Sequence, residues 1–254
     1  MRILIRKNNE AVGQSAAQLM SPFINRGATL GLATGSTPLS TYAELIRLNQ
    51  AAEISFQQCQ AFLLDEYVGI SHTDPNSYYQ TIRDTFTSHI DIANERVFSP
   101  AGDHEDPVVA AQAYENQVAG AGVDIQILGI GANGHIGFNE PSSSLSGLTK
   151  VQTLHPKTVA DNARFFASED EVPTHAITQG LGTISRAKNI LLLAVGEAKA
   201  QAIARAVEGP VSASCPASIL QMHPAVTVII DEAAASRLDN VEYYRHVEQA
   251  NLNE

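Results

Sequence analysis

Residues 28–48 read ATLGLATGSTPLSTYAELIRL and contain, in order, the three parts of one α/β unit. Ala28–Ala33 is a short apolar run, Thr34–Pro38 is a polar loop with one glycine, and Leu39–Leu48 has apolar residues at helical spacing. An apolar run of this length suits a strand that is covered on both faces. The stretch therefore predicts a strand, a tight loop and a helix of a mostly parallel sheet.

The same alternation continues through the rest of the chain. Five further apolar runs are expected to form strands: Arg2–Ile5, Cys59–Leu64, Val123–Leu128, Asn189–Val195 and Ala225–Ile230. Three further stretches have helical spacing: Ala11–Asn25, Val108–Val118 and Ala198–Val207. The predicted fold class is α/β, a doubly wound, mostly parallel, Rossmann-like sheet with helices on both faces. Such sheets bind ligands at the carboxyl ends of their strands.

The chain is predicted to form a single domain over residues 1–254. No repeat or Pro/Gly-rich linker divides the sequence, and 254 residues with 44% hydrophobic content can bury a full core. Residues 142–171 are polar and only weakly periodic, so we expect them to form a mobile lid.

Composition restricts the partners and the location that we expect. The net charge of -11 opposes nonspecific binding to nucleic acid or to an anionic membrane surface. The apolar run after Met1 is too short for a signal peptide and no segment has the length of a membrane span, so we expect a cytoplasmic protein. Cys59 and Cys215 match no metal-ligand spacing and are expected to be reduced packing residues.

The loop Thr34–Pro38 has the composition of a phosphate-binding loop. Gly35 allows the backbone to approach an anion, and Ser36 and Thr37 supply hydroxyl donors next to the positive end of a helix. A Ser or Thr that caps the helix, with Pro38 near its first turn, explains the same residues about as well. The two interpretations are compatible.

Two adjacent carboxylates, Asp65 and Glu66, follow the apolar run Cys59–Leu64. Adjacent acids at the end of a strand more often form a solvated turn or a helix cap than a catalytic site. In this fold class, however, ligands bind where strands end. Asp65 is nearer to the apolar run and is therefore the better candidate for a partly desolvated base.

Residues 128–141, LGIGANGHIGFNEP, contain a G-x-G-x-x-G pattern directly after an expected strand. Dinucleotide binding is disfavoured because Gly137 and Pro141 interrupt the helix that this fingerprint requires. The loop can instead gather Asn133, His135 and Glu140 beside a ligand, where an imidazole could carry a proton. A purely structural histidine is the competing interpretation, and a zinc site is disfavoured because no second histidine lies at ligand spacing.

These segments together resemble one known family. Leu30–Pro38, Leu64–Gly69, Asn76–Tyr79 and Gly131–Pro141 look, in order and spacing, like the glucosamine-6-phosphate deaminase (glucosamine/galactosamine-6-phosphate isomerase) family. The pairing of GHIGFNEP with DEYVG is highly specific, and the resemblance covers nearly the whole chain. It implies an enzyme without metal or cofactor that converts glucosamine-6-phosphate and water to fructose-6-phosphate and ammonia in amino-sugar catabolism.

The resemblance also implies residue roles. Asp65 falls at the position of the base that moves a proton from carbon 2 to carbon 1. His135 falls at the position of the acid/base that opens the sugar ring, with Glu140 as its partner. At the position of Asn133 some members carry Asp. An amide at Asn133 can orient the histidine but cannot stabilise imidazolium by charge.

For the substrate phosphate, the resemblance points to Gly35, Ser36 and Thr37 together with Arg164 and Lys199. Two cations beside a helix N-terminus would give charge-assisted hydrogen bonds to the dianion. Some members are hexamers activated by N-acetylglucosamine-6-phosphate through basic residues. Here Lys150 is present but Gln152 stands where those enzymes tend to have a second cation, so a monomer without this activation is expected rather than a homo-oligomer.

Two alternatives remain open from the sequence. A 6-phosphogluconolactonase-like hydrolase would share the sheet and the phosphate loop, but lactone hydrolysis needs no base for a carbon-bound proton. A non-catalytic sugar-phosphate sensor would share the fold, but the chain has no spare length for a helix-turn-helix segment.

Overall fold

The computed structural model describes residues 1–156, 159–160, 163, 166, 168 and 171–251. Its centre is a seven-stranded sheet in which every pair of neighbouring strands is parallel. The strand order is β1 (Arg2–Arg6), β10 (Val226–Asp231), β9 (Ile190–Ala194), β6 (Ile125–Leu128), β2 (Thr29–Leu32), β3 (Gln60–Leu63) and β5 (Val97–Phe98). The predicted parallel sheet is confirmed, and each of the six predicted strands is present within two residues of its expected bounds.

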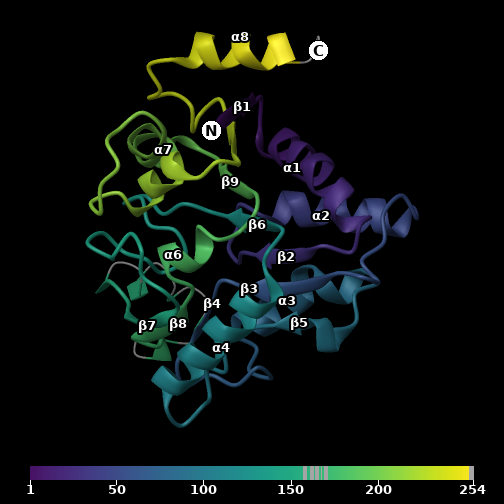
Figure 1. Cartoon of the computed structure of the whole chain (residues 1–254), viewed down its shortest axis with the longest axis vertical. Coiled ribbons are helices and arrows are strands. Elements are labelled where there is room, and N and C mark those ends of the chain that lie inside the picture. The colour runs from purple at the N-terminus through teal and green to yellow at the C-terminus, as the bar shows by residue number, and fades with distance from the viewer. Residues whose placement is uncertain (157–158, 161–162, 164–165, 167, 169–170, 252–254) are drawn as a thin grey trace.

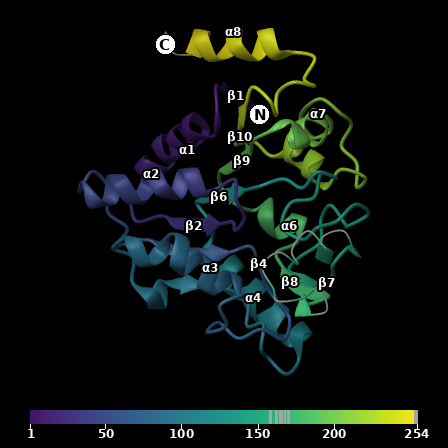
Figure 2. The ribbon, with the colours of Figure 1, turned by 180° about the vertical axis from the view of Figure 1, so that it is seen from behind.

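Helices cover the sheet from both sides, as Figures 1 and 2 show. α1 (Asn9–Ile24) and α2 (Leu39–Gln50) lie on one side, and the short α6 (Leu181–Ile184) and α7 (Ala200–Val207) lie on the other. Other helices in the described part of the chain are α3 (Tyr78–Thr85), α4 (Pro107–Ala121), α8 (Val241–Asn251) and the 3₁₀ helices η1 (Thr87–His89), η2 (Asn94–Arg96), η5 (Glu197–Lys199) and η6 (Pro216–Met222). The two-sided covering explains why the central strands are buried and mostly apolar.

α1 shows how sequence and packing determine a helix here. Asn8 caps its N-terminus by accepting a hydrogen bond from the N–H of Ala11 at 3.0 Å. Its buried face carries Val12, Ala16, Ala17, Met20 and Ile24. Full burial of the larger of these side chains contributes about 1.5–3 kcal/mol each.

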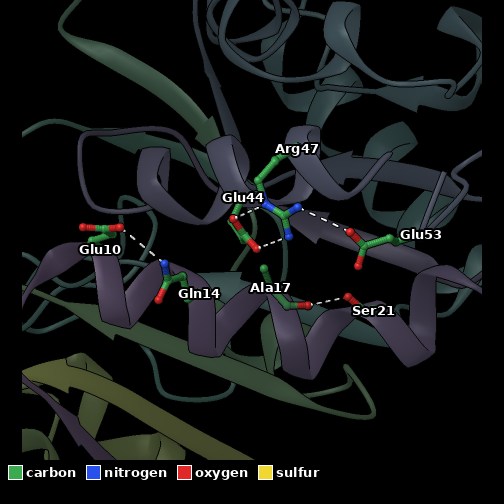
Figure 3. A network of polar contacts seen from close by, with 7 residues as sticks. All are labelled: Glu10, Gln14, Ala17, Ser21, Glu44, Arg47 and Glu53. Carbon is green, nitrogen blue, oxygen red and sulfur yellow. Dashed lines mark hydrogen bonds and ion pairs between the residues drawn. The ribbon is translucent and has the colours of Figure 1, made fainter. Parts of the chain in front are cut away.

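The polar contacts around α1 and α2 are mostly local, as Figure 3 shows. Gln14 donates to Glu10 within α1, and Arg47 of α2 pairs with Glu44 and Glu53 at 2.8 and 3.3 Å. The Arg47 side chain is more than half exposed, and exposed pairs of this kind contribute about 0–1 kcal/mol. The apolar face therefore stabilises this helix layer more than its surface ion pairs do.

The chain reverses its direction of travel across the sheet between β2 and β6. From β2 it proceeds outward through β3 to β5, and it then returns to β6 on the other side of β2 and proceeds to β9 and β10. β2 and β6 are hydrogen-bonded neighbours, with Leu30 opposite Ile125. A crevice forms outside the carboxyl ends of strands at such a switch point. The loops that follow β2 and β6 therefore face one another across this crevice.

A second sheet was not predicted. Its three strands are antiparallel in the order β4 (Asp65–Tyr67), β8 (His175–Thr178) and β7 (Lys150–Thr153). The strands are short and partly polar, which is why no apolar run marks them in the sequence.

The segment that we expected to be a lid, residues 142–171, contains β7. Nine of the other residues of that segment lie outside the described part of the chain, and nothing in the structure tests a lid, so the lid stays a prediction. Within the described part of the chain, no helix is both long enough and apolar enough to span a bilayer.

Candidate active site

A cavity of about 320 Å³ lies at the carboxyl ends of β2, β3 and β6. It brings together the motifs that the sequence singled out. The loop after β2, the start of β4, the loop after β6 and the segment after β9 all contribute to its wall. The lining includes Thr34–Pro38, Asp65, Tyr78, His135, Phe138 and Lys199.

The loop after β2 forms one end of the cavity. Tyr42, which is buried in α2, donates its hydroxyl hydrogen to the carbonyl of Ala33 at 2.7 Å and so fixes the point where β2 ends. Gly35 has a φ of +102°, a backbone conformation that L side chains rarely adopt. α2 then begins at Leu39 without a side-chain cap. In this described stretch the alternative interpretation of a Ser or Thr cap is therefore wrong, and the N-terminal N–H groups are not occupied by a capping side chain.

Asp65 lies where the chain passes from the large sheet to the small one. Leu64 still donates its N–H to Leu32 of β2, whereas Asp65 already pairs with Thr178 of β8. The Asp65 side chain is only 7% exposed and lines the cavity. Burial, with a contribution from the neighbouring Glu66, raises the pKa of Asp65 to about 8. This carboxyl is the desolvated group that the sequence indicated.

His135, Glu140 and Asn133 form a second cluster, on the loop after β6. The Nδ1 atom of His135 lies 3.4 Å from Oε2 of Glu140, within ion-pair range but without a hydrogen bond. Asn133 donates from Nδ2 to the same Glu140 oxygen at 2.6 Å and accepts from the backbone N–H of His135 at 3.1 Å. Asn133 therefore contacts both the Glu140 carboxylate and the main chain of His135.

Two glycines make this loop possible. Residues 129–141, all described, form no helix, so the structure lacks the helix that a dinucleotide fingerprint needs. The His135 ring packs directly on Gly131, where a Cβ atom would lie 2.3 Å from the ring. Gly134 has a φ of +93° and packs against Cys215. Gly131 thus leaves room for the His135 ring, and Gly134 allows the turn. Neither glycine serves the pyrophosphate contact of a dinucleotide fingerprint.

Tyr78 and Phe138 form an aromatic wall of the cavity, which sequence analysis did not assign. Their rings are stacked with centroids 6.0 Å apart. Tyr78 donates its hydroxyl hydrogen to Tyr67 at 3.0 Å. The segment Asn76–Tyr79 was part of the family resemblance, and its two tyrosines after an N-cap serine were the available signal.

Lys199 lines the cavity from η5, after β9. Gly196, with a φ of +86°, turns the chain there, and its N–H donates to the carboxylate of Asp231 at 3.0 Å. The structure thus brings Lys199 to the same cavity as Gly35, Ser36 and Thr37. Arg164, the other predicted phosphate ligand, lies outside the described residues.

A second hollow, of about 430 Å³, lies at the opposite edge of the sheet against the amino ends of β9 and β10. Its lining is largely apolar, and none of the predicted site residues that the structure describes reaches it. Among the described residues, no cluster of three His, Cys, Asp or Glu side chains could hold a metal ion.

Comparison with known proteins gives the family. A family model described as glucosamine-6-phosphate isomerases/6-phosphogluconolactonase matches residues 5–229. The chain belongs to this family. A glucosamine-6-phosphate deaminase from Corynebacterium glutamicum (strain R) is 64% identical over 252 residues, which are 99% of this chain and 100% of that protein. One from Rhodococcus jostii is 50% identical over 97% of this chain and 96% of that protein.

Solved structures of the family agree with this assignment. A monomeric glucosamine-6-phosphate deaminase superposes with a TM-score of 0.91 at 45% identity, covering 93% of this chain and 100% of its own. The 6-phosphogluconolactonase from Trypanosoma brucei has a TM-score of 0.73 at 21% identity, covering 93% of this chain and 98% of its own. The latter likeness shows a shared fold alone.

Proposed function

We propose that this protein is a glucosamine-6-phosphate deaminase, which converts glucosamine-6-phosphate and water to fructose-6-phosphate and ammonia. One observation carries the proposal. The chain is 64% identical over its full length to a relative of that activity. Because water enters and ammonia leaves, the overall reaction is a hydrolysis coupled to an isomerisation, and it belongs to amino-sugar catabolism when it runs toward fructose-6-phosphate.

The proposed reaction begins with opening of the cyclic sugar, in which His135 exchanges a proton between the ring oxygen and the hydroxyl on carbon 1. Glu140 stabilises the protonated imidazole from 3.4 Å, and Asn133 holds the Glu140 carboxylate in place. The position of the His135 imidazole, which lines the cavity with Glu140 beside it, supports this role.

Asp65 is proposed to remove the proton from carbon 2 and deliver it to carbon 1. As the oxygen on carbon 1 gains a proton and the amino nitrogen loses one, the product is an imine at carbon 2, which water then hydrolyses to the ketone and ammonia. A carboxylate in water is a weak base, but burial raises the pKa of Asp65 to about 8 and so makes the ionised form a stronger one.

The phosphate is proposed to bind at the end of the cavity formed by Gly35, Ser36 and Thr37, with Lys199 as a cationic partner and Arg164 as a second one. The uncapped N-terminus of α2 favours an anion there, and the lysine adds a charge-assisted hydrogen bond. This contact anchors the substrate at the end remote from the chemistry.

We further propose a monomeric, cytoplasmic enzyme that needs no metal. The solved relative with a TM-score of 0.91 is monomeric, which supports the first of these statements. The net charge of -11 makes nucleic acid and anionic membranes unfavourable partners.

The decisive experiment measures ammonia and fructose-6-phosphate released from glucosamine-6-phosphate by the purified, chelator-treated protein. Equal amounts of the two products are expected. Hydrolysis of 6-phosphogluconolactone without ammonia release would instead establish the lactonase activity, and binding of the sugar phosphate without turnover would establish a sensor.

A further inference from the structure

Glu66 is a buried ionisable residue that the proposed reaction does not use. Its side chain is 0% exposed, next to Asp65 in β4. Leaving a carboxylate without partners in such a place would cost several kcal/mol. A carboxylate at this position therefore needs hydrogen-bond donors around it.

The Glu66 carboxylate binds the first turn of α3. Oε1 accepts hydrogen bonds from the N–H groups of Tyr78 at 2.9 Å and Tyr67 at 3.0 Å, and Oε2 accepts from the N–H of Tyr79 at 3.0 Å. The N-cap residue Ser77 satisfies the next N–H, that of Gln80. The first three N–H groups of α3 are thus bound by two side chains, and Glu66 supplies the negative charge that a helix N-terminus favours.

Tyr78 connects this contact to the cavity. Its backbone N–H is held by Glu66, while its ring stacks on Phe138 and lines the cavity. We propose that Glu66 is a positioning residue for the candidate active site: its buried carboxylate fixes the first turn of α3 and thereby holds Tyr78 against the cavity beside Asp65. The inference rests on the proposed deaminase function.

The same carboxylate also acts on Asp65 through its charge. Glu66 raises the pKa of Asp65 in addition to the effect of burial. Burial raises the pKa of Glu66 itself above its ordinary value, against the smaller lowering effects of its three N–H donors and of His72. Other ionisable groups that interact with the two carboxyls are Tyr78 of α3 and Tyr114 of α4, both kept neutral because burial raises their pKa. His135 and Lys199 complete the titratable lining of the cavity.

Two substitutions separate position from charge. Glu66→Gln keeps the length of the side chain and removes its charge, so the acid limb of the pH profile of kcat/KM should move to lower pH by about half a pH unit or more. Glu66→Asp keeps the charge but does not reach the helix, so that limb should stay in place while kcat/KM falls about 10- to 100-fold.

Glu115→Gln is the matched control. Glu115 is also a buried glutamate, 4% exposed, but it binds Thr149, Thr183 and Arg186 away from the cavity. Its loss should lower the melting temperature and leave the pH profile unchanged. The substrate ionises in the same way in assays of the wild type and of every variant. Any difference between their pH profiles of kcat/KM therefore arises from groups of the protein.

A double-mutant cycle of Glu66→Asp with Tyr78→Ala tests the connection, and it decides the question alone if Glu66→Gln does not fold. Non-additive losses in kcat/KM are expected, because Glu66 acts through Tyr78. Additive losses, or a Glu66→Gln profile that coincides with the wild-type profile, would overturn the inference. A wild-type protein that releases no ammonia would contradict the proposed function instead.

Discussion

At the scale of single residues, Asp65 combines a proposed catalytic role with an unfavourable position for a charge. The folded protein raises its pKa from an ordinary 3.8 to about 8, so the folded state binds this proton more tightly than the unfolded state. The stability that this difference provides is fully present below about pH 4 and is lost as pH rises toward 8. The ionised base is thus kept at a cost in stability, as is common for active sites.

Asp65→Asn should therefore abolish turnover and stabilise the protein. We expect deaminase activity to fall at least about 100-fold, because an amide cannot accept the carbon-bound proton. The melting temperature should exceed that of the wild type by roughly 2–4 °C or more at pH 8, with little difference at pH 4. Thermal unfolding at the two pH values and the ammonia assay check both parts. Near-normal turnover would remove Asp65 from the mechanism.

The sequence predicted which residues line the cavity, but it did not predict their hydrogen-bond partners. Asp65 and His135 were predicted because each follows an apolar strand, and both line the cavity. The pairing of Asn133 with Glu140 depends on how the glycine turn folds back, which no residue pattern encodes. Glu66 was not assigned because a strand-end acid gives no indication of the distant N–H groups that it binds.

At the scale of elements, the loop after β6 depends on Gly131. A Cβ atom at this position would lie 2.3–2.5 Å from three atoms of the His135 ring. Gly129, two residues earlier, has no atom within 4 Å of the corresponding point. The two glycines therefore differ sharply in what a methyl group would displace.

Gly131→Ala should displace the imidazole and reduce kcat/KM by about 100-fold, since small misplacements of a catalytic group have effects of that size. Gly129→Ala should lose far less. Steady-state kinetics of the two variants, with circular dichroism as the test of folding, make the comparison. Equal losses in both would mean that the loop tolerates the shift and that the ring does not depend on Gly131.

Buried, apolar strands could be predicted from the sequence, whereas short and partly polar elements could not. Strands β2, β6, β9 and β10 were predicted because they are largely buried and mostly apolar. β4, β7 and β8 form a small antiparallel sheet whose polar, three- or four-residue strands have no such signal. α3 was missed because its eight residues include only one fully buried aliphatic side chain, Ile82.

At the scale of the whole molecule, a monomer is expected. Multi-angle light scattering should give a mass close to 27.2 kDa, the mass of one chain, with and without N-acetylglucosamine-6-phosphate. The rate of deamination should not change when the acetylated sugar is added, because Gln152 stands where a second cation would be needed. A hexameric mass, or activation by the acetylated sugar, would contradict this expectation.

The passage of the chain from one sheet to the other at Leu64 and Asp65 has a consequence for substrate choice. The proposed phosphate loop follows β2 of the large sheet, whereas Asp65, the proposed base, is held by its pairing with β8 in the small sheet. The two strand pairings therefore fix the backbone distance between the proposed anchor loop and Asp65. We therefore expect the site to discriminate sugar phosphates by chain length, because a pentose phosphate held at the same anchor would place its carbon 2 one carbon–carbon bond farther from Asp65.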